Sequence, residues 1–239
     1  MDKVDNAAMA FSNMLNQKAK DRTLKKTERT RYLILSMLAH RFEFHPTAKV
    51  TVESILEETG LSRGTFYNHF KDVDECIYVL FQLFMEQWDD RVRSPQPKDL
   101  FASIFEVNHY YCVRYEQNAP LFAAYTYYAA GLPDLLALRN RINSDWVKRI
   151  VSTIRKKTAP GLTSTQVQKL EGCIKMLVAM TIETLRERYI NCDDMLTQAF
   201  KTSEELTHAI SRQWYPVLAK PEEFLKELEL RPGQNNDKT

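Results

Sequence analysis

Residues 51–71 read TVESILEETGLSRGTFYNHFK. Its apolar residues recur at helical spacing on both sides of Gly60, and glycine readily adopts the left-handed geometry in which many helices end. Ser62 is a helix-capping residue type, so we expect one helix at 52–59 and a second that begins at Arg63. Two short helices joined by a glycine-containing turn form a helix-turn-helix.

The two predicted helices divide their side chains between a core and a surface. We expect the apolar side chains to lock the helices together; these are Ile55, Leu56, Leu61, Phe66 and Phe70. The second helix then offers short or hydrogen-bonding side chains outward, namely Arg63, Thr65, Tyr67, Asn68 and His69. Such side chains let a helix enter the major groove of DNA, where Arg and Asn can bind base edges. Gly64 removes a side chain where the backbone would come closest to the DNA.

Residues 51–81, TVESILEETGLSRGTFYNHFKDVDECIYVLF, resemble the DNA-binding signature of the TetR family of transcriptional regulators. The resemblance is strong over about residues 27–90 and elsewhere concerns only length and helical layout. It implies that Thr51, Tyr67, His69 and Lys71 contact the DNA backbone. It also implies that Ser62, Arg63, Gly64 and Thr65 lie nearest the bases, and Asn68 completes the predicted interface. One departure is Val73, where the family often has a lysine.

A basic segment precedes this motif. Residues 18–31 contain seven lysines and arginines and only two acids, a net charge of +5, whereas the whole chain carries +2. Such a segment beside a compact domain is suited to contact with DNA phosphates. A solvated, disordered tail is the alternative interpretation.

The rest of the chain also has a helical pattern. Only six of its 239 residues are glycine, and helix-favouring residues dominate long stretches, so we expect an all-α protein. A three-helix N-terminal DNA-binding domain with the helix-turn-helix would precede a larger C-terminal helical domain for ligand binding and dimerisation. The further helices are expected at 27–44, 73–92, 98–117, 121–130, 134–157, 165–190 and 203–219. Asp72 is expected to cap the helix at 73–92, and residues 94–98, Ser-Pro-Gln-Pro-Lys, are the expected linker between the two domains. The expected divisions are a flexible basic arm at 1–26, the DNA-binding domain at 27–72, a connecting helix at 73–93, the effector-binding and dimerisation domain at 98–220 and a polar tail at 221–239.

The resemblance implies a homodimeric repressor that binds a palindromic double-stranded operator and is released by a small hydrophobic or amphipathic ligand. Dimerisation is expected through helices 165–190 and 203–219. Aromatic, methionine and amide side chains suit a ligand pocket. The candidate effector-binding residues are Asn108, Tyr111, Phe122, Tyr125, Tyr128, Trp146, Met176 and Met180. Each of them could instead be simple core.

Other functional classes lack their sequence signals. The chain has no glycine-rich phosphate loop, no His-Glu-x-x-His and no recognisable nucleophile motif, so we expect neither an enzyme nor a bound cofactor. Its histidines and four distant cysteines show no metal-ligand spacing, and free thiols favour a cytoplasmic protein. The most apolar stretch, Leu121–Leu132, is too short to span a bilayer, so we expect no membrane segment. The remaining alternatives are a helical interaction module, an activator, and a regulator without a small-molecule effector.

Overall fold

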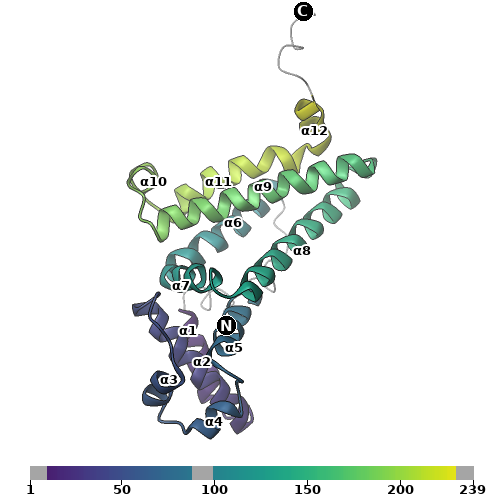
Figure 1. Cartoon of the computed structure of the whole chain (residues 1–239). Helices are drawn as coiled ribbons and strands as arrows, with labels where there is room; N and C mark the ends of the chain where they lie inside the picture. Colours follow the sequence, from purple (N-terminus) through teal and green to yellow (C-terminus); the bar gives the residue numbers. More distant parts are fainter. Residues whose placement is uncertain (1–9, 88–98, 230–239) are drawn as a thin grey trace, which may run out of the picture. The chain divides into compact units, whose positions relative to one another are not determined.

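The computed structural model describes residues 10–87 and 99–229, and every regular element in those ranges is an α-helix (Figure 1). The predicted all-α fold is therefore confirmed. The helices are α1 Phe11–Lys20, α2 Lys26–Phe44, α3 Val52–Thr59, α4 Arg63–Tyr67, α5 Val73–Glu86, α6 Leu100–Gln117, α7 Ala119–Ala129, α8 Pro133–Lys157, α9 Ser164–Tyr189, α10 Asp194–Ala199, α11 Ser203–Ala219 and α12 Pro221–Glu229.

The helices belong to two compact units. Unit 1 comprises Met1–Pro95, Val113–Arg139 and Arg188–Asp193, and unit 2 comprises Gln96–Cys112, Asn140–Glu187 and Asp194–Thr239. Helices α6, α8 and α9 thus contribute residues to both. The end of the helix predicted at 73–92 and the expected linker at 94–98 lie outside the described residues, as do 1–9 and 230–239.

Helix α2 is the centre of unit 1 and contacts α1, α3, α5 and α7. The sequence predicts one apolar face on this helix, formed by Ile34, Leu35, Leu38 and Phe42, and each of these side chains is at most 2% exposed. The Phe42 ring stacks on that of Phe81 in α5, with the ring centroids 5.9 Å apart. The predicted apolar face is therefore the core of the unit.

Helix α1 corrects the expectation of a flexible arm at 1–26. Phe11 and Leu15 are 0% and 1% exposed, and the Phe11 ring meets Phe84 edge-on at 5.1 Å. The backbone N–H of Phe11 donates a hydrogen bond to Oδ1 of the buried Asn118, at 3.2 Å. Two apolar side chains one helical turn apart thus attach α1 to the core, although most of the other side chains of this helix are polar.

We expect Phe11→Ala to lower the free energy of unfolding by about 3–5 kcal/mol, because it empties a fully buried aromatic site. Urea titration followed by circular dichroism measures the change. Asn13→Ala, at an exposed position of the same helix, is the control and should shift stability by no more than about 0.5 kcal/mol. Equal, small effects of the two substitutions would show that α1 is not part of the core.

The ends of α3 and α4 follow the local sequence signals. The Thr51 hydroxyl accepts a hydrogen bond from the third backbone N–H of α3 at 3.2 Å, and the Ser62 hydroxyl does the same for α4 at 3.1 Å. Gly60, with φ of 69°, ends α3 in the left-handed conformation. Asp72 caps the start of α5. The predicted caps at Ser62 and Asp72 and the predicted end at Gly60 are confirmed.

Unit 2 combines residues of α6, α8, α9, α11 and α12. Trp214 of α11 is its main link: its indole N–H donates to the hydroxyl of Thr181 in α9 at 2.9 Å, and its ring meets Trp146 of α8 at 5.7 Å. Where the sequence predicts a polar tail from residue 221, the structure has α12. This helix buries Leu225 completely and forms an ion pair between Glu229 and Lys169 of α9. In the described ranges, none of the helices has both the length and the apolar character needed to cross a bilayer.

Candidate nucleic-acid interface

Helix α4 and its flanking residues have one buried side and one exposed side. Phe66 and Phe70 are 0% and 1% exposed, as the sequence predicts. The exposed residues of the segment are Ser62, Arg63, Gly64, Tyr67 and Asn68, while Thr65 and His69 are half-buried. Tyr67 is 51% exposed although it is large and aromatic. The structure thus brings the predicted base-facing residues to one short, exposed segment.

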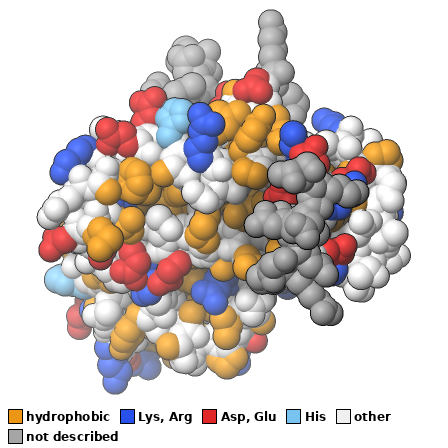
Figure 2. Space-filling view, turned by 90° about the horizontal axis from the view of Figure 1, so that it is seen from above, with side chains coloured by type: hydrophobic (Ala, Val, Ile, Leu, Met, Phe, Trp, Pro, Cys, Tyr) orange, Lys and Arg blue, Asp and Glu red, His pale blue; other side chains and the backbone are white. Residues whose placement is uncertain are grey.

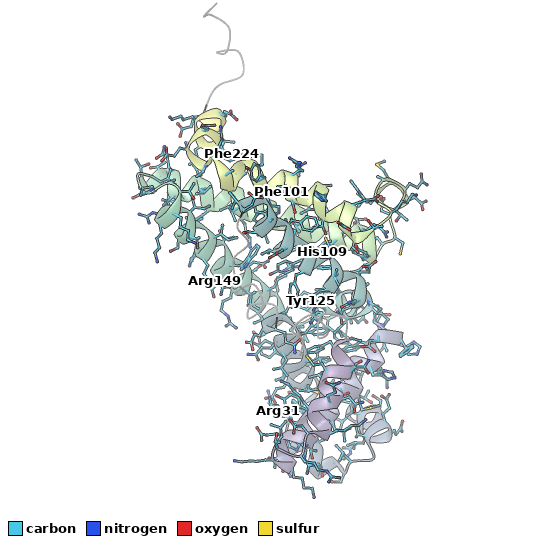
Figure 3. The ribbon with its side chains drawn as sticks, turned by 180° about the vertical axis from the view of Figure 1, so that it is seen from behind. Arg31, Phe101, His109, Tyr125, Arg149 and Phe224 are labelled. Atoms are coloured by element: carbon cyan, nitrogen blue, oxygen red, sulfur yellow. The ribbon has the colours of Figure 1, made fainter. Side chains whose placement is uncertain are left out.

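The buried side attaches this segment to α2. The Phe66 and Phe70 rings lie 5.8 Å apart, and the guanidinium of Arg31 lies over the Phe70 ring at 5.1 Å. Arg31 is in the first part of α2 (Figure 3). The start of α2 therefore lies beside the end of α4, which brings the basic segment 18–31 to the same part of unit 1.

The basic segment is ordered by contacts of its own. The Asp21 carboxylate accepts hydrogen bonds from the N–H and hydroxyl of Thr23, which closes the turn between α1 and α2. Lys18 lies over the Tyr32 ring at 5.1 Å. The exposed cations of this segment are Lys18, Lys20, Arg22, Lys25, Lys26 and Arg31. Their charges are therefore carried by two helices and a short turn, which differs from the alternative of a disordered tail.

Arg63 is paired with a residue that sequence reasoning missed. Its Nη2 donates to Oε1 of Glu53, in the first turn of α3, and the two side chains are 62% and 56% exposed. A hydrogen bond from Glu53's own backbone, and to a smaller degree the charge of Arg63, hold the pKa of this carboxyl below its ordinary value. The residues are ten apart on different helices, so no local spacing rule could have paired them.

The predicted backbone-contacting residues flank α3 and α4. The Thr51 hydroxyl caps α3. The Lys71 side chain is 85% exposed, and its ammonium lies 3.5 Å from the Asp72 carboxylate. Burial, and then the charge of Arg31, lower the pKa of His69. Its imidazole is therefore neutral at pH 7 and has one N–H to donate.

Gly64 has no role in the internal packing of the unit. A Cβ atom at this position would meet nothing closer than the Ser62 hydroxyl, at 4.0 Å, and Gly64 does not have the positive φ that favours glycine elsewhere. Glycine in a helix costs roughly 1 kcal/mol relative to alanine. Neither its φ nor a close contact requires glycine here, and the backbone at Gly64 is open on the exposed side of α4.

Tyr128 of α7 contacts the loop that precedes α3. The Tyr128 hydroxyl donates to the carbonyl of Ala48 at 2.5 Å, and the Tyr128 ring lies 5.1 Å from that of Phe42. Burial raises the pKa of Tyr128, so the hydroxyl stays protonated and can donate. Since the loop leads directly into Thr51, Tyr128 positions the start of α3.

We expect Tyr128→Phe to lower the free energy of unfolding by about 1 kcal/mol, because the ring is kept while the hydrogen bond to Ala48 is lost. Chemical denaturation measures this difference. Tyr127→Phe is the control, since Tyr127 is 52% exposed and should lose less than about 0.5 kcal/mol. If the two variants lose the same stability, Tyr128 does not support the loop through its hydroxyl.

The predicted effector-binding residues do not all fall in one unit. Phe122, Tyr125 and Tyr128 belong to unit 1, and Asn108, Tyr111, Trp146, Met176 and Met180 belong to unit 2. In unit 1 these side chains take part in internal packing. Phe122 stacks on Tyr115 with 3.7 Å between ring centroids, and the Tyr125 hydroxyl donates to the Leu135 carbonyl at 3.1 Å.

The candidates in unit 2 also differ among themselves. Asn108 is 3% exposed and its amide donates to the Ser211 hydroxyl at 3.1 Å, while the rings of Tyr111 and Trp146 meet edge-on at 5.8 Å. Met176 and Met180 of α9 are instead 71% and 37% exposed. The methionines therefore lie on the surface of the described chain, whereas Asn108 is interior.

Comparison with known proteins assigns no family: no family model matches the chain, and no curated protein matches it either. Within the described ranges, His, Cys, Asp and Glu side chains do not gather in groups of three or more that could hold a metal ion.

Proposed function

We propose that the protein is a DNA-binding transcriptional regulator in which α3 and α4 form a helix-turn-helix and α4 is the helix that enters the major groove. The observation that carries this proposal is the division of α4 and its flanks between two buried phenylalanines and an exposed set of polar, hydrogen-bonding side chains. Such a helix is oriented by its core and can bind DNA with its outer side. The resemblance of residues 51–81 to the TetR family supports the same interpretation.

The charges around α4 support contact with an anionic polymer. Arg31 of the basic segment at 18–31 contacts Phe70, just after α4, and Lys71 is the next residue in the chain. Lysine and arginine that neutralise phosphates supply much of the affinity of proteins for DNA. In this proposal Thr51, Tyr67, His69 and Lys71 bind the backbone. Ser62, Arg63, Gly64, Thr65 and Asn68 face the bases, and the open backbone at Gly64 admits the DNA.

We expect Arg63→Ala to weaken binding to a selected operator by about 5- to 150-fold, the loss that corresponds to one base contact of 1–3 kcal/mol. Tyr67→Phe removes one hydroxyl and should weaken binding by about fivefold. Gel shift at fixed salt measures both variants, after circular dichroism has shown that they are folded.

Arg141→Ala and Tyr127→Phe are the matched controls, because they make the same changes at exposed positions outside α3 and α4. Both should bind DNA like the wild type. Wild-type affinity in the Arg63 and Tyr67 variants would refute the assignment of this interface.

We also propose that the regulator is a homodimer that binds a palindromic operator and pairs through α9 and α11. Support comes from the outer side of α9, where the apolar side chains of Met176 and Met180 are exposed. Figure 2 shows that hydrophobic side chains reach the surface at several places on one face of the molecule. A two-fold dimer would cover such side chains on both chains at once.

We expect Met176→Glu to convert the dimer into a monomer of 28.0 kDa, because it would bury two unpaired carboxylates at the interface. Light scattering after size exclusion measures the mass. Ser152→Glu, at an exposed position of α8, should leave the dimer intact. A wild-type monomer, or a Met176→Glu dimer, would contradict pairing through α9.

Release by a small hydrophobic or amphipathic effector completes the proposal. Its support is the aromatic and polar cluster of unit 2, in which the buried amide of Asn108 could orient a polar group and the rings of Tyr111 and Trp146 could contact an apolar one. Phe122, Tyr125 and Tyr128 belong to unit 1, and Met176 and Met180 are exposed, so the proposal keeps the effector role for Asn108, Tyr111 and Trp146.

A further inference from the structure

The contact between Glu53 and Arg63 joins the first turns of two different helices on an exposed surface. Glu53 is the second residue of α3, and Arg63 is the first residue of α4. Two of the three acids of α3 are in ion pairs, and the pairs differ in where they lie. Glu58 pairs with Arg41 of α2, within the scaffold, whereas Glu53 pairs with a residue of the proposed reading helix.

The contact with Glu53 uses only part of the Arg63 guanidinium, which leaves other N–H donors for a base. Arginine has five N–H donors in a planar fork, and the contact to Glu53 uses Nη2 on one side of it. The remaining donors can meet two acceptors on one base edge. Guanine offers two acceptors, O6 and N7, in the major groove, whereas adenine offers one acceptor beside a donor. An arginine held in one orientation therefore selects guanine, while a freely rotating arginine can also turn toward phosphates.

The Glu53 carboxylate would disfavour DNA binding if Arg63 did not pair with it. The pKa of Glu53 is below its ordinary value, so the group is ionised at neutral pH and would repel the phosphates of any DNA. Pairing with Arg63 neutralises that charge where the two residues meet. Glu57, on the same helix, is exposed and forms no ion pair in the described part of the chain, so it adds charge without orienting a donor.

We propose that Glu53 and Arg63 act as one reading pair, in which Glu53 is a positioning residue that orients the guanidinium of Arg63 toward a guanine of the operator. This inference rests on the proposed DNA-binding function. It adds that each half of the operator contains one guanine whose recognition depends on an acidic residue of α3, which itself need not touch the DNA.

The test begins with selection of binding sites from a random pool of double-stranded DNA by the full-length wild-type protein. The same selection with Arg63→Ala then identifies the guanine, which lies at the position where this variant no longer prefers one base. Fluorescence anisotropy at fixed salt then compares duplexes that carry guanine or adenine there. We expect the wild type to prefer guanine by about 5- to 150-fold. Glu53→Ala should reduce that preference by about fivefold, the lower end of this range, while affinity for an unrelated duplex is unchanged or higher.

Glu57→Ala is the matched control, because it removes the same charge from the same helix and should keep the wild-type preference. In a protein that already carries Arg63→Ala, Glu53→Ala should have no further effect on base preference. Circular dichroism verifies that the variants are folded, and alanine favours the helix at both positions.

The outcomes separate this inference from the function on which it rests. If the wild type binds no DNA, the proposed function itself fails. If the wild type selects a site but Glu53→Ala keeps the full preference for guanine, the reading pair is refuted while DNA binding stands. The pair is also refuted if Glu53→Ala raises affinity for all duplexes equally, because Glu53 then acts only as a repelling charge.

Discussion

Helix α4 has only five residues, and a helix of that length does not persist on its own in water. It exists because Phe66 and Phe70 are buried against the scaffold and because Ser62 caps its first turn. The arrangement of every exposed side chain in the candidate interface depends on this burial. The two phenylalanines also determine which side of α4 faces outward, so the surface chemistry of the segment follows from its core. Arg31 of α2, distant from α4 in sequence, contributes to this burial because its guanidinium lies over the Phe70 ring.

Sequence reasoning correctly predicted those elements that are marked by residues close together in the sequence. Gly60, Ser62 and Asp72 mark helix ends through their own backbone preferences or side-chain hydrogen bonds, and the structure has helix ends there. The buried side of α4 followed from the spacing of Phe66 and Phe70. Such features depend on residues three or four positions apart, which is the range over which sequence patterns carry information.

The elements that sequence reasoning missed depend on distant contacts. Helix α1 is stabilised by Phe84 and Asn118, and its own sequence is too polar to indicate a core helix. The sequence predicts a ligand contact at Tyr128, because an aromatic residue at helical spacing suits a pocket as well as a core. Only the contact of its hydroxyl with Ala48 distinguishes the two roles. Glu53 had no predicted role, since its partner lies across a turn.

The hydrogen bond between Phe11 and Asn118 spans 107 residues of sequence, and it bears on how the chain folds during synthesis. A nascent chain released from the ribosome only as far as residue 95 contains α1 to α5 but neither Asn118 nor Tyr128. Its N-terminal helices would still lack the acceptor for the Phe11 N–H and the aromatic side chains of α7. Unit 1 is therefore completed late in translation, after α6 and α7 and, for its last segment Arg188–Asp193, most of α9 have left the ribosome exit tunnel.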